Sequence, residues 1–361
     1  MKNGSIKVLL IATSPLQQDG LTKVLFDYYE NADRMIYAVD VASGLLPQKT
    51  YVDRIHSFGG RYFQLPARTR DILHYILKLK ELCKCEDYDI VHVHGNSATM
   101  AIDLYGAWLG GVKKRITHSH SVTTEHKTVN LLLKPLFNSL ATDCVACSQA
   151  AGKWLYTKPY RIIYNVISVE AFRFNKLERM NMRKALGLTD DFVIGHVGRF
   201  SYPKNHKFLL DVFRQVIQTN KQCKLIMVGN GEDLDIIRGK IEVLGLQDKT
   251  IIIDSSNEVN KLMLAMDVFM LPSRFEAFPL VALEAQASGL PCLLSDVITS
   301  EIKVNDNCEF LSIASIDQWV HHILDLSNGE SSLRFDCADT VKKAGFDIEV
   351  LSSTITKLWE C

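Results

Sequence analysis

Short apolar runs alternate with longer amphipathic segments along the first half of the chain. Each run spans four to eight residues, is rich in β-branched side chains and does not alternate with polar positions. Such continuous runs are typical of strands covered on both faces of a parallel sheet. Helical segments such as 22–30 and 98–110 separate the runs and predict right-handed βαβ crossovers in a doubly wound α/β domain. The runs lie at 7–13, 35–41, 89–94, 115–120, 143–148 and 161–166.

The pattern restarts after a charged stretch at 175–191. We therefore expect two Rossmann-like domains, at 1–168 and 169–345, facing a cleft in which ligands bind at the carboxyl ends of the strands. The tail, at about 346–361, has helical spacing and is expected to pack back on the first domain. The second series consists of apolar and amphipathic segments at 192–198, 207–218, 223–229, 232–245, 250–254, 261–266, 268–272, 280–288 and 291–296.

Composition supports this division and limits the partners. A chain of 361 residues exceeds what one hydrophobic core usually organises. Its 47% hydrophobic and 23% charged residues exclude intrinsic disorder and a small disulfide scaffold. Equal numbers of basic and acidic residues, 41 of each, argue against a general nucleic-acid binder. Residues 1–175 hold 21 basic and 15 acidic residues, which indicates phosphates or an anionic membrane face as a partner, with chance distribution as the alternative.

Cysteine usage and the opening segment bear on location. The nine cysteines are scattered without framework spacing, as expected in a reducing cytosol. The opening apolar run, 7–12, is too short for a signal sequence or a membrane span. We expect a cytoplasmic protein, peripheral on the inner face of the cell membrane if its basic half binds lipid.

Two glutamates form the densest candidate constellation, SRFEAFPLVALEAQASGLPCLLSD. Glu276 lies in a loop directly after a predicted strand, and Glu284 lies about two turns into the following helix. Eight residues with a loop included span on the order of 10–12 Å, roughly the distance from a sugar to the ribose of a sugar nucleotide. A solvated glutamate on an amphipathic helix is the alternative.

The start of that helix is a candidate phosphate site. Pro279 can occupy the first helical turn, although it has no N–H to offer. The amides of Phe278, Leu280 and Val281 would point at a diphosphate, because a helix start combines unpaired donors with a positive dipole end.

Two cations follow another predicted strand, in HVGRFSYPKNHKF. Arg199 and Lys204 lie in the loop between the strand and a helix. Cations at the carboxyl end of a strand would neutralise a pyrophosphate leaving group, the arginine by holding two oxygens and the lysine as a point charge. A solvated basic loop is the alternative.

These segments resemble a known family. The motifs at 198–205, 228–234, 265–292 and 118–121 look like those of the family-4 retaining glycosyltransferases of the GT-B fold. The similarity is greatest to bacterial capsular and exopolysaccharide glycosyltransferases. It covers nearly the whole chain, is most specific at 194–296 and is looser in the first 110 residues.

The resemblance implies roles for the charged residues. Glu276 and Glu284 match the family's E-x7-E pair, in which the first contacts the hydroxyls of the transferred sugar and the second the ribose hydroxyls. Arg199 and Lys204 match the basic pair on the diphosphate. The resemblance also implies that no metal or other cofactor is needed, because basic residues and helix amides take the role of a divalent ion.

The resemblance implies further contacts with the donor. His120 matches the histidine that closes on the donor sugar, and Gly20 resembles the glycine-rich turn whose backbone approaches the diphosphate. Ser255 to Val259 match the loop around the base. Departures such as Asp254 and Ser256 stand where the family often has glycine and arginine, and they put the specificity for the base in question.

Four histidines fall at predicted strand ends, in two pairs two residues apart. Residues two apart in a strand share a face, so each pair can point together. A hydrogen-bonded role in the cleft is expected for His94 and His120, and core packing is as good an interpretation for His92 and His118. No nearby carboxylate or cysteine completes a metal site.

Two further motifs are set aside. Gly229-x-Gly231 follows a strand, but Leu234 takes the third glycine position of a dinucleotide fingerprint. Asp233 and Asp235 form a D-x-D triplet that opens a helix, and we interpret it as helix capping.

The expected acceptor site lies on the first domain. A stretch of mixed basic, aromatic and aliphatic residues spans 61–84, and its helical part, 71–82, could lie on an anionic membrane and reach a lipid-linked saccharide. A surface helix packed on its own sheet is the alternative. The basic residues are Arg61, Arg68, Arg70, Lys78, Lys80 and Lys84.

We therefore expect a retaining hexosyltransferase in surface polysaccharide synthesis. The donor is a nucleotide diphosphate sugar, with UDP favoured by family habit, and the acceptor is a hydroxyl of a saccharide or lipid-linked saccharide. A non-catalytic nucleotide-sugar sensor or partner subunit of the same fold is the alternative, and a sugar-nucleotide epimerase is a further one. Ala277, in place of the glycine usual after the first glutamate, is among the departures that motivate the sensor.

Overall fold

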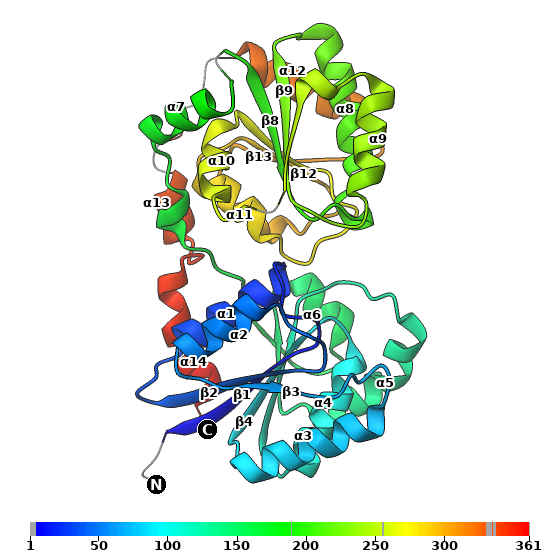
Figure 1. Cartoon of the computed structure of the whole chain (residues 1–361), viewed down its shortest axis with the longest axis vertical. Helices are drawn as coiled ribbons and strands as arrows, with labels where there is room; N and C mark the ends of the chain where they lie inside the picture. The colour runs from blue at the N-terminus through cyan, green and yellow to red at the C-terminus, as the bar shows by residue number, and fades with distance from the viewer. Residues whose placement is uncertain (1–4, 189, 255, 330–333, 335–336, 361) are drawn as a thin grey trace. The chain divides into compact units, whose positions relative to one another are not determined.

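The computed structural model describes residues 5–188, 190–254, 256–329, 334 and 337–360, and it divides the chain into two compact units (Figure 1). The first unit comprises Met1–Val166 and Ile348–Cys361, and the second comprises Ile167–Asp347. The sequence placed the two boundaries after residues 168 and 345, each two residues away from those of the structure.

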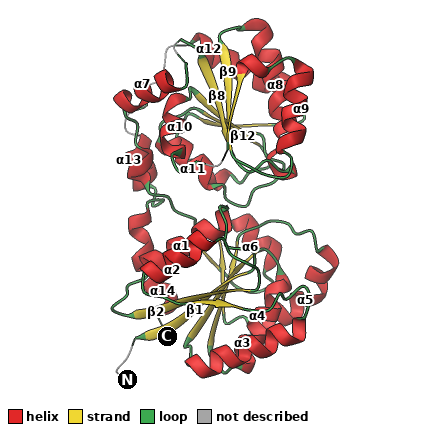
Figure 2. Ribbon diagram, in the orientation of Figure 1, coloured by secondary structure: helices red, strands yellow, loops and turns green. Residues whose placement is uncertain are grey.

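The first unit contains a parallel sheet of seven strands in the order β3-β2-β1-β4-β5-β6-β7. From β1 the chain builds outward through β2 and β3 and then returns to the other side of β1 with β4, so the winding direction changes between β1 and β4. Figure 2 shows helices on both faces of this sheet. The strands are Ile6–Ala12, Tyr37–Ser43, Tyr62–Gln64, Ile90–Gly95, Lys114–Ser119, Asp143–Ala146 and Arg161–Ile162 for β1 to β7.

Side-chain caps start several of these helices. Asp19 accepts a hydrogen bond from Thr22 N at the start of α1, and Asp71 accepts one from His74 N at the start of α3. Each cap satisfies one of the amides that lack a partner at a helix start. The helices are Gly20–Asn31, Lys49–Ser57, Ile72–Glu86, Ala101–Leu109, Lys127–Leu140 and Gln149–Leu155 for α1 to α6, with the C-terminal α14 at Leu351–Trp359.

The C-terminal helix α14 belongs to the first unit, and it packs against α1. The Trp359 ring is fully buried and meets the Tyr37 ring edge-on, with centroids 5.1 Å apart. A buried tryptophan side chain removes a large apolar area from water. The last helix therefore contributes to the core of the first unit.

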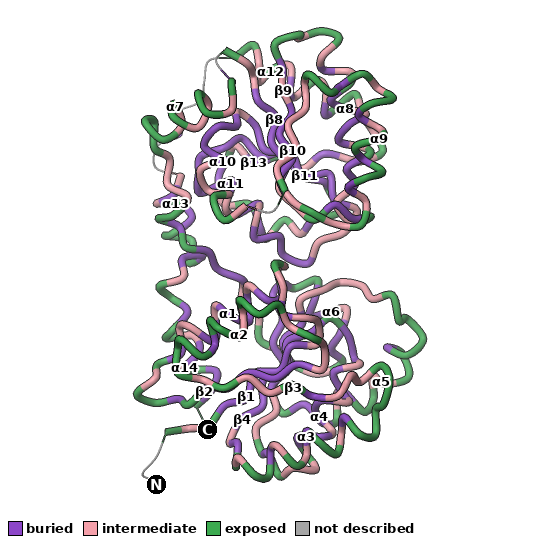
Figure 3. Tube along the Cα trace, viewed as in Figure 1, coloured by how far each residue is buried: buried purple, intermediate pink, exposed green. Residues whose placement is uncertain are grey.

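The second unit contains a parallel sheet of six strands in the order β10-β9-β8-β11-β12-β13, so its winding direction changes between β8 and β11. Figure 3 shows the central strands of this sheet as largely buried. The strands are Phe192–Val197, Cys223–Val228, Thr250–Ile253, Val268–Leu271, Cys292–Ser295 and Cys308–Leu311 for β8 to β13. The helices are Lys176–Ala185, His206–Thr219, Leu234–Leu244, Val259–Ala265, Leu280–Ala287, Ile316–Asn328 and Cys337–Lys343 for α7 to α13.

The sequence pattern missed β3 and β13. Both are edge strands of three or four residues with partly exposed side chains, so they lack the continuous apolar run that marks a central strand. The apolar run at 261–266, given as part of the second series, forms most of helix α10. Short apolar runs do not distinguish a buried helix from a strand.

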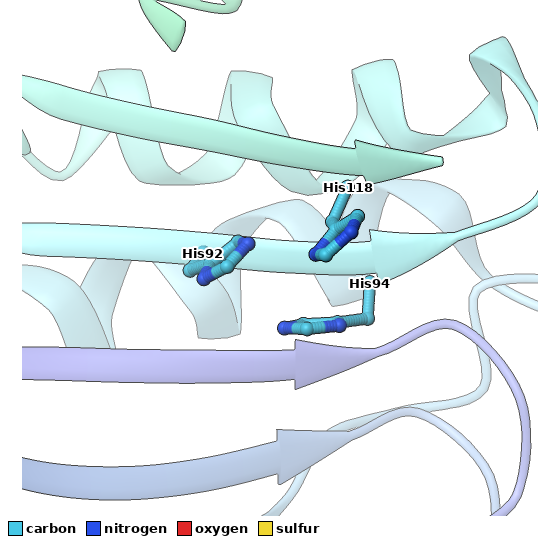
Figure 4. A group of neighbouring side chains, drawn as sticks. All are labelled: His92, His94 and His118. Atoms are coloured by element: carbon cyan, nitrogen blue, oxygen red, sulfur yellow. The ribbon is translucent and has the colours of Figure 1, made fainter. Parts of the chain in front are cut away.

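Four histidines form an array on one face of the first sheet. In the register of β4 and β5, His94 lies opposite His118, so His92, His94 and His118 project from the same face, where Figure 4 shows their rings grouped together. His120 follows directly after β5, and its ring stacks on that of His94 at 5.2 Å between centroids. His92, His94 and His118 have no exposed surface.

Burial keeps this array uncharged. Desolvation is the main cause that lowers the pKa of His92, His94 and His118 well below the usual value, and neighbouring imidazoles lower it further. Desolvation lowers the pKa of His120 to about 3. All four rings are therefore neutral at pH 7.

Acid should destabilise the first unit. An unfolded histidine has a pKa of about 6.5 and His120 one of about 3 in the fold, so the unfolded chain binds more protons between these values. The contribution of the neutral histidines to the free energy of unfolding is thus complete above pH 6.5 and falls as the pH drops. At pH 5 the loss is about 2 kcal/mol for His120 alone. Urea unfolding at pH 7 and pH 5 should show this loss, and His120→Asn should reduce it. The exposed His56 supplies the control, and an equal pH slope in His56→Gln and His120→Asn would contradict the assignment.

Candidate active site

The predicted cations and the first glutamate meet at the switch point of the second sheet. Arg199 and Lys204 follow β8, and Glu276 follows β11, the two strands between which the winding direction changes. Two loops that leave a parallel sheet in opposite directions open a crevice at the carboxyl ends of their strands, where ligands bind in such folds. The structure thus brings these three residues to one edge.

Lys204 and Glu276 form a short ion pair. Lys204 Nζ lies 2.6 Å from Glu276 Oε1, which also accepts a hydrogen bond of 3.0 Å from Ser273 Oγ. Each charged side chain is only 16% exposed. Partial burial strengthens such a pair relative to a surface ion pair, so the carboxylate and the ammonium hold each other in position.

A glycine makes room for the lysine. A Cβ placed on Gly198 would lie 3.1 Å from both Cδ and Cε of Lys204, closer than most real contacts of a Cβ. The aliphatic stem of Lys204 therefore passes over a backbone that carries no side chain. Gly198, which directly precedes Arg199 in the motif, thus leaves space for the side chain of Lys204.

Asn205 fastens the two loops to each other. It adopts a left-handed conformation with φ 58°, its Nδ2 donates to Pro272 O at 3.2 Å, and its Oδ1 accepts from Arg274 Nη2 at 2.8 Å. The backbone of Arg274 also donates to Pro203 O at 2.7 Å. Asn205, Ser273 and Arg274 were not predicted from the sequence, although an asparagine directly before a helix is a recognisable turn signal.

Arg199 is held more loosely than Lys204. Its Nε lies 3.0 Å from Glu232 Oε2, and the two side chains are 54% and 59% exposed. Exposed ion pairs contribute about 0–1 kcal/mol, so an anionic ligand can replace the carboxylate at little cost. Glu232 was also missed, because nothing in the spacing connects it to Arg199.

Gly229 has a structural role beside Arg199. It has φ 145°, and a Cβ there would lie 2.1 Å from Gly198 O. The loop after β9 therefore packs directly on the loop after β8 only because this position is glycine. This close approach explains why position 229 is a glycine, and no bound dinucleotide is needed to explain it.

Helix α11 begins at Leu280, where the predicted segment 280–288 begins, but Pro279 lies one position before the place predicted for it. Pro279 is its N-cap, with φ −76°, and not a residue of the first turn, so Leu280 is the first helical residue. The first amides of a helix, here those of Leu280 and Val281, lack intrahelical acceptors. The Phe278 ring is buried against that of Phe346, 5.8 Å away, which leaves its backbone for any ligand contact. Glu284 lies on α11 and is half-buried.

The predicted base loop is only partly described. Ser255 lies outside the described residues, and Val259 is the first residue of α10 and half-buried. Asp254 lies 3.7 Å from Arg238, measured between Oδ1 and Nη2.

The D-x-D triplet occupies the start of α9 but does not cap it as predicted. Asp233 is the N-cap residue, yet its side chain makes no capping hydrogen bond. Asp235 lies in the first turn, 3.5 Å from Arg238. The favourable position of an acidic group near the helix dipole remains.

In the first unit, Gly20 lies at the switch point between β1 and β4. It is the exposed first residue of α1, directly after the capping Asp19. A Cβ placed on Gly20 would meet nothing within 4 Å. Packing within the protein therefore does not require glycine here. Because Gly20 has no side chain, there is space beside the start of α1.

Among the described residues, one group has the side chains and spacing of a metal site. Ring nitrogens of His92, His94 and His118 lie within 4.8 Å of one another, and three histidines are a known zinc ligand set. Trp359 Nε1, which can only donate, is hydrogen-bonded to His92 Nδ1 at 3.3 Å. The neutral His92 ring then carries its proton on Nε2, so a metal would have to displace Trp359. The group fits a hydrogen-bonded array better than a metal centre.

The basic stretch at 61–84 does not form one basic surface. Arg61 lies 2.7 Å from Asp40 and 2.8 Å from Glu86, and Arg68 lies 2.7 Å from the buried Asp103. These two arginines are therefore used within the fold. The exposed basic residues that remain are Arg70, Lys78 and Lys84, while Lys80 is half-buried.

Helix α3 itself exposes apolar side chains. Ile72, Leu73 and Leu77 are 51%, 68% and 50% exposed, whereas Tyr75 and Leu79 of the same helix face the core. No helix within the described ranges has the length and apolarity to cross a membrane.

Family models match both halves of the chain. One described as "Glycosyltransferase Family 4" matches residues 18–171, and one described as "Glycosyl transferases group 1" matches residues 178–344. The chain is 29% identical to the putative glycosyltransferase EpsF of Bacillus subtilis, over 83% of this chain and 82% of EpsF. It is 28% identical to an Escherichia coli UDP-Gal:alpha-D-GlcNAc-diphosphoundecaprenol alpha-1,3-galactosyltransferase, over 73% of this chain and 74% of that enzyme.

Solved structures show the same architecture. Anabaena HepE in complex with UDP-glucose superimposes with a TM-score of 0.82 at 19% identity, and 98% of each chain is covered. WaaG, a glycosyltransferase involved in lipopolysaccharide biosynthesis, superimposes with a TM-score of 0.73 at 16% identity, over 98% of this chain and 100% of WaaG. The two parallel sheets are thus those of the GT-B fold. The chain belongs to the glycosyltransferases that join a Family 4 domain to a group 1 domain.

Proposed function

We propose that the chain transfers a hexose from a UDP-sugar to a hydroxyl of a saccharide or lipid-linked saccharide in surface polysaccharide synthesis, with retention of the anomeric configuration. The observation that carries this proposal is the Lys204–Glu276 pair of 2.6 Å between the loops after β8 and β11. This pair puts a cation beside a carboxylate at the switch point of the sheet, where ligands bind in such folds, and it supports a site for a diphosphate and a sugar hydroxyl. UDP-glucose in HepE and the UDP-Gal named for the Escherichia coli relative support the nucleotide.

The second unit supplies positive charge for the leaving group. As the bond from the sugar to the diphosphate breaks, negative charge grows on the diphosphate oxygens, and preorganised donors stabilise it. Arg199 exchanges its exposed partner Glu232 for the diphosphate, and Lys204 adds a second cation. The amides of Leu280 and Val281 at the start of α11 contribute the dipole end of a helix. These groups replace the divalent ion that other transferases use, so the reaction needs no metal.

The carboxylates orient the donor. Glu276, fixed by Lys204 and Ser273, accepts hydrogen bonds from hydroxyls of the transferred sugar. Glu284 on α11 takes the ribose hydroxyls, and the loop from Ser255 to Val259 lies around the base.

The first unit contributes neutral groups. Its helix start at Gly20 has space for a diphosphate to approach the backbone, and His120 contacts the donor sugar. A neutral imidazole can hydrogen-bond to a hydroxyl without placing a positive charge beside the oxocarbenium-like sugar of the transition state.

The acceptor attacks on the face from which the diphosphate departs. The C1–O bond to the diphosphate breaks, the bond from the acceptor oxygen to C1 forms, and a diphosphate oxygen takes the acceptor proton. This route retains the configuration and needs no side chain as nucleophile.

A membrane-bound acceptor fits the surface around α3. The exposed Ile72, Leu73 and Leu77 can enter the interface of an anionic membrane, and Arg70 and Lys84 add attraction to its headgroups. Beside α3 lies a hollow of about 660 Å³ with apolar lining from Phe63, Leu65, Pro66 and Leu82. Such a surface would bring the protein to the inner face of the membrane, where a lipid-linked saccharide is presented.

Activity with a panel of UDP-, GDP- and ADP-sugars should select UDP. Incubation with an undecaprenyl-diphosphate saccharide should release UDP and give an α-linked product from an α-linked donor, and the rate should persist in EDTA. NMR of the product determines the configuration. UDP-sugar binding without turnover across many acceptors would favour the sensor, and interconversion of the sugar without UDP release would favour an epimerase.

Arg199→Ala combined with Lys204→Ala should lower kcat strongly, because each removed contact to developing charge costs about 10²–10³ in rate. Steady-state kinetics with the donor identified in the panel measures the effect. Lys207→Ala combined with Arg214→Ala removes the same charge from exposed positions on α8 and should change kcat by less than about two-fold. A loss below about tenfold in the first double variant would refute the leaving-group assignment.

Liposome sedimentation should report binding to anionic vesicles that weakens with salt. Leu73→Asp combined with Leu77→Asp should abolish it, because aspartate side chains do not bury in the apolar part of the interface and are repelled by anionic headgroups. Met35→Asp combined with Leu46→Asp adds the same two charges at positions outside α3 that are 91% and 82% exposed, and it controls for the added charge. Sedimentation that is independent of anionic lipid, or unchanged in the Leu73 and Leu77 variant, would exclude α3 as the membrane surface.

A further inference from the structure

At one end of the histidine array, the donor and the acceptor of a hydrogen bond can be assigned. Trp359 Nε1 donates a hydrogen bond to His92 Nδ1 at 3.3 Å, and an indole nitrogen can only donate. Burial lowers the pKa of His92 well below its usual value, so the ring is neutral and carries one proton. With Nδ1 acting as acceptor, that proton lies on Nε2.

The other end of the array is also hydrogen-bonded. His94 Nδ1 lies 3.1 Å from His120 Nε2, and the two rings are nearly parallel, with an interplanar angle of 8°. One of these nitrogens donates and the other accepts, because both rings are neutral. The tautomer of His94 therefore determines that of His120.

His92 lies between these two fixed contacts. Its ring is 4.3 Å from that of His94 between centroids, and the Nε2 atoms of both rings are buried with no hydrogen-bond partner in the part of the chain that the structure describes. If His94 carried its proton on Nε2, both of these buried atoms would be donors and neither could serve the other. A bare Nε2 on His94 provides an acceptor beside the His92 proton, through a small shift or one water.

The other neighbours do not remove this preference. His118 stacks parallel to His92 at 5.6 Å, and the Tyr28 ring meets His92, His94 and His118 edge-on at 5.3 to 5.4 Å. The Tyr28 hydroxyl and both nitrogens of His118 have no partner among the described residues, so their donor and acceptor roles are open. The ring of His94 is the nearest of the three to that of His92, at 4.3 Å between centroids, which favours His94 as the acceptor. Trp359 is the neighbour of the array whose donor role is fixed.

We propose that Trp359, His92 and His94 are positioning residues that hold His120 as the neutral tautomer with its proton on Nδ1. The sequence of contacts runs from the Trp359 N–H through His92 and His94 Nδ1–H to His120 Nε2. His120 is then left with one unpartnered polar group among the described residues, an Nδ1–H donor that is itself buried and must be uncovered to meet a sugar. Its importance for transfer rests on the proposed function, in which His120 contacts the donor sugar, so the sugar oxygen that meets His120 must be a hydrogen-bond acceptor.

This inference gives the C-terminal helix a role in the donor site of the first unit. Trp359 lies at the end of α14, 239 positions after His120 in the chain. The helix lies on the same unit and reaches the array through one ring nitrogen. A change at Trp359 should therefore alter His120 without touching a substrate.

Long-range ¹H–¹⁵N spectra of the protein labelled with ¹⁵N-histidine test the tautomers directly, without turnover. In the unmodified protein, His92 should carry its proton on Nε2, and His94 and His120 on Nδ1. Trp359→Phe keeps the ring but removes the N–H, so all three should become tautomer mixtures. A proton on Nε2 of His120 in the unmodified protein, or an unchanged pattern in Trp359→Phe, would overturn the proposal.

Two substitutions at His94 test the consequence for transfer. Asparagine can place an N–H near the position of Nδ1, whereas leucine fills the space without a donor. His94→Leu should lower kcat by up to about 10²-fold, as misplacement of a contacting group does, with UDP affinity unchanged, and His94→Asn should recover most of the rate. Equal losses in two folded variants would show that the hydrogen bond is not the cause. If the unmodified protein transfers no sugar, the proposed function fails, and the spectra still decide the tautomer.

Discussion

The ion pair between Lys204 and Glu276 is the interaction on which the candidate site depends. It joins the loops after β8 and β11, the two strands at which the sheet of the second unit changes its winding direction. Without Glu276, the ammonium group of Lys204 would be partly buried and would lose hydration without a compensating partner. It would also be repelled by the positive charge of Arg199, which lies on the same loop. With the carboxylate at 2.6 Å and Ser273 as a second donor to it, both charges stay in place. Arg199, by contrast, remains exposed and exchangeable.

Backbone constraints hold this pair where it is. Gly198 lets the stem of Lys204 cross the loop, and Gly229 lets the loop after β9 rest against that same backbone. Asn205 accepts a left-handed conformation and connects the two loops through both atoms of its amide. Small residues and one asparagine therefore position the charged side chains.

The two units provide different kinds of polar groups. The second presents cations and carboxylates at its switch point, whereas the first presents a helix start with space at Gly20 and a neutral imidazole at His120. Burial keeps the histidine array uncharged, and Trp359 gives it direction. In the proposed reaction, positive charge is needed at the diphosphate and not at the sugar, and this division of polar groups is consistent with that need.

The sequence by itself determined the two parallel α/β domains, because continuous apolar runs indicate strands buried on both faces. It also determined the residues at the switch points, because these belong to short motifs that follow the strands directly in the chain. It did not determine the short edge strands β3 and β13, or the contacts of Glu232 with Arg199 and of Asn205 with Arg274. Those depend on segments distant in sequence. Likewise, His92 and Trp359 are 267 positions apart, and only the packing of α14 within the first unit makes them neighbours. The direction of their hydrogen bond depends on which atoms meet in space, so only the tertiary structure could decide it.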